Sequence, residues 1–447
     1  MAKRAAWGLV AVALAGAAAV TARPVAAVGG DRPETGRLYR SGEGSDASVR
    51  LMAVGNRPDG RPLVVAEATF ACEELELEGT VLIPVKRDGS FRVESNQFGL
   101  TGGGTDEVDA EVELRGRFSG SRVEGTITAE AEAFDNAGTT GTCDEEIDWD
   151  ARAGASNAAL ERIDATVRLE AGPAVVAAAP DAAYVATTSS DGEAPPLHRV
   201  DAATDEVAWQ VETGTEIAAL AATTAAVWAV DSEGTSLRRI DARTGLPVAV
   251  VTLGEPVASA PSIAADDTAV WVAAGDLYRI DPATNAVVAT IDLGEGSDDT
   301  VLALGAGAVY VAIDASSPDD VSRLVRVDPA TNTVVTEVEG AGDLVALAAG
   351  DDALWAAPFF EDVRRLDPTT LVEHGAVDVE AHALAAASPG VWMLTERGVT
   401  AYDGADPDQA AVRIPLLGGD FGTLAANGNT VWVWDARLGT LTRVEAG

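Results

Sequence analysis

One unit of about 40 residues repeats through most of the chain after residue 163, and this repeat restricts the fold more than any other feature. Its clearest copy spans 268–293, TAVWVAAGDLYRIDPATNAVVATIDL. Two turn-forming segments, 274–276 and 281–285, separate three short apolar runs, which predicts an antiparallel meander. The small-residue run 259–265 supplies a fourth strand. Four strands per unit and this period are typical of β-propeller blades.

Two positions of the unit recur along the chain, an aromatic residue in the second strand and an acidic residue at the next corner. The aromatic residues are Tyr184, Trp228, Trp271, Tyr310, Trp355, Trp392 and Trp432. The acidic residues are Asp201, Asp241, Asp281, Asp328, Asp367, Asp403 and Glu445. This pattern predicts a seven-bladed propeller over 163–447. Because residues 163–171 look like the end of a blade, we expect 166–170 to pair with 440–444 and close the ring.

Local propensity conflicts with this prediction in the first strand of several blades. Runs such as 218–222 and 345–349 are rich in Ala and favour helix. Each is only about five residues long and precedes a strand-forming aromatic run, so we expect strands. At the corner of the unit, Arg279 and Asp281 lie two residues apart on one side of a strand. We expect them to pair, and Asp281 to close the following turn with Thr284.

The segment 48–154 has the alternating pattern of strands with one solvated face. About seven strands are predicted there, which fits a small antiparallel sandwich or barrel with Trp149 in its core. Residues 28–47 are expected to form a flexible lead, and 155–162 a linker to the propeller at 163–447.

Residues 1–27 have the features of an export signal. Lys3 and Arg4 precede an apolar run at 5–20, which is shorter than the ~20 residues of a spanning helix. Cleavage predicts an extracellular protein, whereas an uncleaved signal would anchor it at the cell surface. Two cysteines, Cys72 and Cys143, then favour one disulfide in an oxidising compartment, with two buried thiols as the alternative.

The chain is strongly acidic, with a net charge of −40. Such a surface repels nucleic acid and anionic membranes. Asp298, Asp299, Asp319 and Asp320 belong to a group of acids expected on one rim of the propeller. They could bind calcium or magnesium, but no ordered ligand spacing is present, and clustering of solvated acids is expected in a chain of this charge.

Two further pairs fall on loops of the same rim. His382 follows Glu380, and a general base with a nearby acid could serve catalysis there; a structural loop histidine is the alternative. Phe359 and Phe360 follow Pro358 in a loop, where adjacent aromatic residues predict a contact patch or a plug for the channel mouth. The sequence contains no phosphate-binding loop, nucleophile elbow or zinc-protease motif.

The Val-Trp-Val-Ala and Arg-Ile-Asp-Pro-Ala-Thr-Asn segments resemble the YVTN and virginiamycin B lyase-like propellers of exported bacterial proteins. The lyase resemblance implies a His base, an acid and a divalent metal, but the lyase motif is not reproduced around His382. The segment 201–209 is similar to one blade of a quinoprotein, and a single such blade does not support a quinone cofactor. Residues 116–126, Cys143 and 149–152 resemble a small domain of exported bacterial proteins.

These observations predict an exported, non-catalytic binding or scaffold protein that recognises an extracellular ligand or protein through the propeller rim. A lyase-like or other metal-assisted enzyme is the first alternative. A structural component of the cell surface or surface layer is the second.

Overall fold

The computed structural model consists of antiparallel strands, with no α-helix among the residues that it describes. None of those residues forms a helix long and apolar enough to span a membrane. The described residues are 32–33, 37–42, 47–56, 62–72, 75–96, 98–100, 107–135, 138–154, 162–187, 194–255, 261–294, 300–314, 321–350, 352–387, 390–395, 398–403, 406–414 and 422–445. The predicted signal at 1–27 and residues 155–161 of the predicted linker lie outside them.

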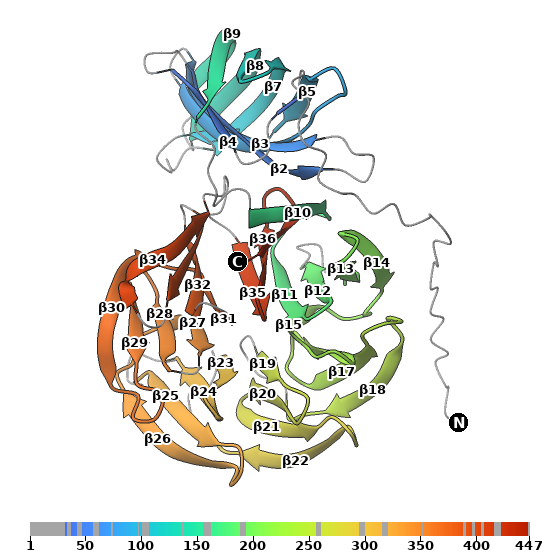
Figure 1. The fold of residues 1–447 in the computed structure, drawn as a ribbon, viewed down its shortest axis with the longest axis vertical. Helices are drawn as coiled ribbons and strands as arrows, with labels where there is room; N and C mark the ends of the chain where they lie inside the picture. The colour runs from blue at the N-terminus through green and yellow to red at the C-terminus, as the bar shows by residue number, and fades with distance from the viewer. Residues whose placement is uncertain are drawn as a thin grey trace.

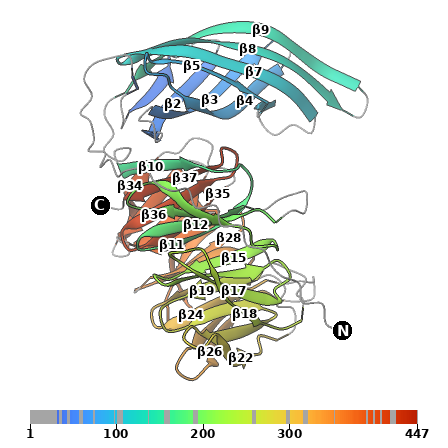
Figure 2. The same cartoon turned by 90° about the vertical axis from the view of Figure 1, so that its right-hand side faces the viewer.

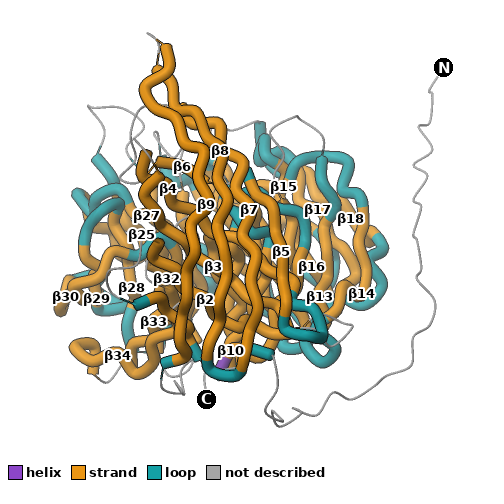
Figure 3. The backbone as a smooth tube through the Cα atoms, turned by 90° about the horizontal axis from the view of Figure 1, so that it is seen from above, coloured by secondary structure: helices purple, strands orange, loops and turns teal. Residues whose placement is uncertain are grey.

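The N-terminal region is one nine-stranded sheet with the order β5-β7-β8-β9-β1-β2-β3-β4-β6. Because β4 contacts β5 and β6 contacts β7, the sheet curls into a nearly closed barrel (Figure 2). Figure 3 shows β7, β8 and β9 side by side across it. The strands are β1 Leu38–Ser41, β2 Ala47–Asn56, β3 Pro62–Cys72, β4 Leu75–Pro84, β5 Ser90–Ser95, β6 Phe98–Leu100, β7 Glu107–Ser119, β8 Arg122–Asp135 and β9 Gly138–Ala153.

This arrangement corrects two expectations. Of the two alternatives, sandwich or barrel, the sheet forms the barrel. The corrected points are the number of strands, which is nine in the described residues rather than about seven, and the lead segment. The additional strands are β6 and β1, and β1 lies in the segment expected to be a flexible lead. It pairs with both β2 and β9, so its backbone hydrogen bonds join the two halves of the sheet.

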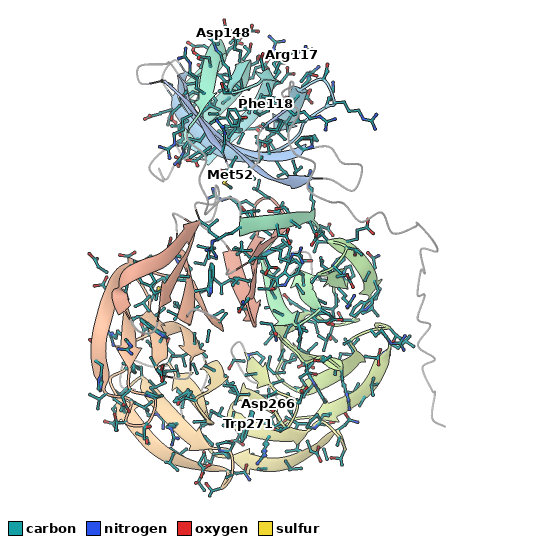
Figure 4. The ribbon with its side chains drawn as sticks, viewed as in Figure 1. Met52, Arg117, Phe118, Asp148, Asp266 and Trp271 are labelled. Carbon is teal, nitrogen blue, oxygen red and sulfur yellow. A yellow bond between two sulfur atoms is a disulfide. The ribbon has the colours of Figure 1, made fainter. Side chains whose placement is uncertain are left out.

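Large aromatic side chains fill the barrel, and Trp149 is buried there as predicted. Gly116 and Gly125 lie opposite each other on β7 and β8. A Cβ atom at Gly116 would lie 2.7 Å from the Phe91 ring, and one at Gly125 would lie 2.6 Å from the Trp149 ring. The two glycines therefore leave room for the rings over bare backbone. In Figure 4, Phe118 lies inside the sheet.

A disulfide joins Cys72 and Cys143, as predicted, with 5.4 Å between their Cα atoms. These residues lie on β3 and β9, which are separated in the sheet by β1 and β2. β1 pairs with β9 only as far as Ala151, and β2 pairs with β3 only as far as Phe70. The disulfide thus links the two long strands beyond the ends of the short ones.

The C-terminal region is a seven-bladed propeller of four-stranded sheets (Figure 1). The Ala-rich first strands are strands, as predicted, and each contacts the first strand of the next blade around the closed ring. Blades one to three are β11 Ala174–Ala179, β12 Ala182–Thr187, β13 Leu197–Asp201 and β14 Glu206–Val211; β15 Ile217–Ala222, β16 Ala226–Asp231, β17 Ser236–Asp241 and β18 Pro247–Thr252; β19 Ser262–Ala265, β20 Val270–Ala274, β21 Asp276–Asp281 and β22 Ala286–Ile291.

The remaining blades follow the same order from the axis outward. They are β23 Thr300–Gly305, β24 Ala308–Ile313, β25 Arg323–Asp328 and β26 Thr333–Glu339; β27 Leu344–Ala349, β28 Leu354–Pro358, β29 Asp362–Leu366 and β30 Glu373–Glu380; β31 Ala383–Ala387, β32 Gly390–Thr395, β33 Gly398–Asp403 and β34 Asp406–Ile414; and β35 Gly422–Asn427, β36 Thr430–Asp435, β37 Thr440–Glu445 and β10 Ile163–Arg168.

Blade seven is built from both ends of the propeller segment. Strand β10 pairs with β37, so that Thr166 lies opposite Thr442, and their hydroxyl oxygens are 3.1 Å apart. The indole of Trp434 donates a hydrogen bond to the Gly172 carbonyl at 3.0 Å. These contacts provide the ring closure expected for this pair of segments.

The barrel and the propeller share a buried apolar cluster at blades six and seven, where β2 contacts β10. Met52 lies at this junction in Figure 4. The barrel contributes Met52, Leu63, Val65 and Leu82, and the propeller residues include Ile163, Ile414, Leu438 and Val444. Because one core serves both regions, the outward face of β2, β3 and β4 is apolar at this place instead of polar.

The corner arginines make contacts different from those expected. Arg279 donates to the Pro329 carbonyl at 2.6 Å and to the Asn332 side chain at 2.8 Å, both in the next blade. The expected pairing with Asp281 is therefore not its main contact. Asp281 does close its own turn, as predicted, by accepting from Ala283 N at 2.8 Å and Thr284 Oγ1 at 3.0 Å. These hydrogen bonds lower the pKa of Asp281.

The same interblade link recurs at other blades. Arg239 donates to the Pro282 carbonyl and the Asn285 side chain, and Arg443 donates to the Ala202 carbonyl. Blade one is the exception that fits the sequence expectation, because its arginine, Arg199, pairs with Asp201 at 2.9 Å.

Candidate binding site on the rim of blade five

The predicted pair Glu380 and His382 lies where β30 leads into β31. Both side chains are exposed, and the His382 backbone N–H donates to the Leu394 carbonyl at 2.9 Å. The other two histidines lie elsewhere: His374 is exposed on β30, and His198 is buried within β13, where burial lowers its pKa.

The structure brings no metal site together from the residues it describes. Among these ranges, no group of three or more His, Cys, Asp or Glu side chains is placed to hold a metal ion. The predicted rim acids Asp298, Asp299, Asp319 and Asp320 lie outside the described residues. Calcium or magnesium binding by them therefore stays a prediction.

One buried acid, Asp231, has a structural role. Asp231 is buried at the end of β16. Its carboxylate accepts hydrogen bonds from Thr235 N at 2.8 Å and Ser236 Oγ at 2.5 Å. It holds the turn between β16 and β17, and these hydrogen bonds already occupy both of its oxygens.

Phe359 and Phe360 form the most exposed aromatic feature of the described surface. They occupy the turn between β28 and β29, with 56% and 69% of their surface exposed. Their ring centroids are 4.0 Å apart at an interplanar angle of 42°. Phe360 has φ of 56°, a left-handed conformation that is rare for a bulky residue. Strained residues of this kind cluster at functional sites.

Local hydrogen bonds hold this turn in place. Phe359 N donates to the Asp343 carbonyl at 2.9 Å, which ties the turn to the segment entering β27. Arg364 pairs with Glu361 at 2.6 Å and donates to the Ala341 carbonyl at 2.9 Å. The rings therefore project from an anchored turn rather than from a free loop.

Val345 extends the apolar surface toward the inner strand. It is the extra residue of a bulge in β27, because Leu344 pairs with Pro358 and Ala346 with Ala357. The bulge leaves 39% of Val345 exposed. We call Val345, Phe359 and Phe360 the blade-five patch.

Exposed carboxylates surround the blade-five patch. Asp343, Glu361, Asp362 and Glu380 are all exposed. Asp362 and Glu380 are direct partners across β29 and β30, although like charges in this position repel each other. The sequence pointed to the Phe pair through two adjacent aromatic residues after a Pro. It gave no signal for Val345, which resembles the apolar residues of every other inner strand.

A separate cavity of about 170 Å³ lies between blades three and four, where Asp266 and Trp271 are labelled in Figure 4. Its polar groups are already paired within the chain. Asp266 accepts from Thr268 N at 2.7 Å and Ala269 N at 2.8 Å, and Arg279 forms the interblade link. The blade-five patch is therefore the stronger candidate for recognition.

No family model and no curated protein matches the chain. Among solved structures, BamB from Moraxella catarrhalis is similar over 63% of this chain and 99% of its own, with 16% identity and a TM-score of 0.42. Kuenenia stuttgartiensis hydrazine synthase is similar over 62% and 97%, with 15% identity and a TM-score of 0.45. These values concern the fold alone. The seven-bladed propeller is confirmed by the strands themselves, and the YVTN and virginiamycin B lyase-like resemblance stays a prediction.

Proposed function

We propose that the chain is an exported, non-catalytic binding protein that uses the blade-five patch to recognise a protein partner. The observation that carries this proposal is the exposed pair Phe359 and Phe360, whose rings contact each other at a tilt on an anchored turn. A covered Phe contributes up to roughly 150–250 Å² of contact area, so the pair can form the centre of an interface.

The hydrogen bonds around the turn support a binding role for the two exposed rings. The two rings are already ordered against each other, and the backbone on both sides is hydrogen-bonded. An ordered anchor loses little conformational entropy when a partner covers it. The Phe360 backbone has a left-handed φ and its ring is exposed. Most other large aromatic side chains of the described residues are buried.

Two observations support export and a scaffold role. The disulfide between Cys72 and Cys143 fits an oxidising compartment, as does the signal-like segment at 1–27. The shared core at Met52 and Ile163 joins the barrel to the ring, so the propeller can present its rim from a fixed support.

Selection from a displayed peptide library tests the proposal on the purified full chain. The wild type is expected to enrich a set of sequences that the Phe359→Ser/Phe360→Ser variant does not enrich. Val248→Ser/Val250→Ser is the matched control, because it removes two exposed apolar side chains from the outer strand of blade two. If the Phe variant enriches the same sequences as the wild type, the blade-five patch is not the binding site.

A further inference from the structure

We infer that the segment recognised by the blade-five patch is positively charged, with Arg or Lys side chains next to apolar ones. This inference rests on the proposed function and adds the chemical class of the partner. Three properties of the site support it: exposed acids whose charge the described residues do not balance, exposed aromatic rings, and apolar side chains beside both.

The charges around the patch are not balanced by the residues that the structure describes there. Arg364 is the nearest cation of the turn, and it pairs with Glu361 and the Ala341 carbonyl. Asp362 and Glu380 are Cα partners of β29 and β30 at a break in the strand register, and both are exposed acids. A cation of a partner that binds beside both residues would be attracted by two negative charges at once.

The exposed rings favour the same kind of partner. A guanidinium group binds over an aromatic face through the electrostatic field of the ring. The described blades already use this contact three times, with Arg239 at 5.2 Å from the centre of Trp228, Arg279 at 5.3 Å from Trp271 and Arg443 at 5.8 Å from Trp432. Phe360 is the most exposed large apolar residue described, so its ring is available to a cation from outside.

The apolar part of the patch distinguishes a peptide from a small cation. Val345, Phe359 and Phe360 extend from the inner strand to the tip of the turn and need apolar contacts to be covered. An anionic partner, such as nucleic acid or an acidic lipid surface, would meet both the local acids and the net charge of −40. A basic segment with interspersed apolar residues satisfies both parts of the surface.

The test uses the full chain and three labelled twelve-residue peptides. The first alternates Arg with Leu, the second replaces Arg by Glu, and the third replaces Leu by Ser. Binding is measured by fluorescence anisotropy at low and at physiological salt. We expect the Arg-Leu peptide to bind more tightly than either of the others, with an affinity that falls as salt rises.

Two charge variants then separate local recognition from general attraction. Asp362→Asn/Glu380→Gln removes the facing acids beside the patch. Glu111→Gln/Glu130→Gln removes an equal pair that faces across β7 and β8 in the barrel, far from any exposed aromatic pair. The first variant should weaken binding by about fivefold or more, and the control by less than about twofold. Thermal unfolding should show no loss of stability in the first variant, since it removes a repulsion.

Each outcome has one meaning. If the two charge variants weaken binding equally, or if no peptide binds, the inference of a cationic partner is overturned. If the Glu peptide binds best and Phe359→Ser/Phe360→Ser abolishes its binding, the inference fails while the proposed function stands. If binding of every peptide is unchanged by the Phe substitutions, the proposed function fails with it.

Discussion

Arg279 donates a hydrogen bond to the side chain of Asn332, which lies 53 residues further along the chain and in the next blade. The same guanidinium contacts the ring of Trp271, its partner across β20 and β21. The aromatic residue, the arginine and the corner of the next blade therefore form one connected unit. Tyr310 makes the link with its own hydroxyl, which donates to the Pro368 carbonyl of blade five at 2.7 Å.

Blade six lacks the arginine of this unit. The residue opposite Trp392 is Ala401 instead of an arginine. The next blade is the seventh, in which β37 and β10 belong to distant parts of the sequence and are not joined by a corner turn. The arginine is thus absent at the one blade whose neighbour lacks the turn that would accept its hydrogen bonds.

We expect Arg279→Lys to lower the free energy of unfolding by about 1–2 kcal/mol, because an ammonium group cannot reproduce the forked contacts and ring stacking. Urea unfolding measures the change. Arg243→Lys, at an exposed corner arginine, is the control and should have little effect. Equal losses in both variants would contradict a specific role for the interblade link.

Asp205 predicts a pH dependence of stability. Burial raises the pKa of its carboxyl to about 6 from 3.8, although the nearby Arg443 acts in the opposite direction. The folded chain therefore binds the proton of the Asp205 carboxyl more tightly than the unfolded chain does. Protonation of this carboxyl stabilises the fold fully below pH 3.8, and this stabilisation is lost as the pH rises through 6.

Asp205→Asn should consequently stabilise the protein at pH 7.5 by about 1 kcal/mol, after allowing for the partial exposure of the group, and by little near pH 4. Asn already occupies the same corner position, with the same φ of 55°, at Asn285 and Asn332. Thermal unfolding across this range checks the prediction, with the exposed Glu206→Gln as control. A less stable variant at pH 7.5 would show that the pair with Arg443 outweighs burial.

Removal of the disulfide should destabilise the barrel selectively. For a separation of 71 residues, Cys72→Ala/Cys143→Ala is expected to lose about 4 kcal/mol in the chain-entropy description. Hydrogen exchange should show lost protection in β3 and β9, while blades two to four serve as the internal control. An equal loss of protection in those blades would mean that the two regions unfold as one unit.

The paired glycines of the barrel give a packing test. Gly125→Ala would place a methyl group within 2.6 Å of the Trp149 ring and 2.2 Å of the Arg115 carbonyl oxygen, and should cost about 1–3 kcal/mol. Gly99→Ala is the matched control, because no atom lies within 4 Å of its added carbon. Chemical denaturation compares the two, and similar stabilities would argue against close packing at Gly125.

The repeat made the propeller predictable because the same sequence pattern recurs in the blades and forms the same four-stranded sheet each time. Seven aromatic residues and their corner acids were sufficient to place the strands, and the blade-like segment 163–171 predicted the ring closure. The contacts of Arg279 were not predictable, since residues two apart on a strand suggest a local pair and nothing in one unit shows which atoms of the next blade come within reach. The barrel was harder because β1 and β6 are short and have no repeat to reveal them.

The candidate site was predictable only in part. Phe359 and Phe360 stand out as adjacent aromatic residues in a loop, whereas Val345 became exposed through a bulge that depends on pairing with β28. The like-charge pair Asp362 and Glu380 also depends on strand register. Residues 18 positions apart become neighbours only after β29 and β30 are aligned.

Because β10 pairs with β37, the seventh sheet cannot assemble until residues 440–445 have been synthesised. Six blades can form earlier during synthesis, but they remain an open arc with uncovered ends. A message truncated just before residue 440 would leave β10 unpaired beside the barrel, and the apolar junction around Ile163 without Val444. Closure of the ring therefore depends on two strands that leave the ribosome far apart in time, and products that end before β37 expose unpaired strand edges to quality control.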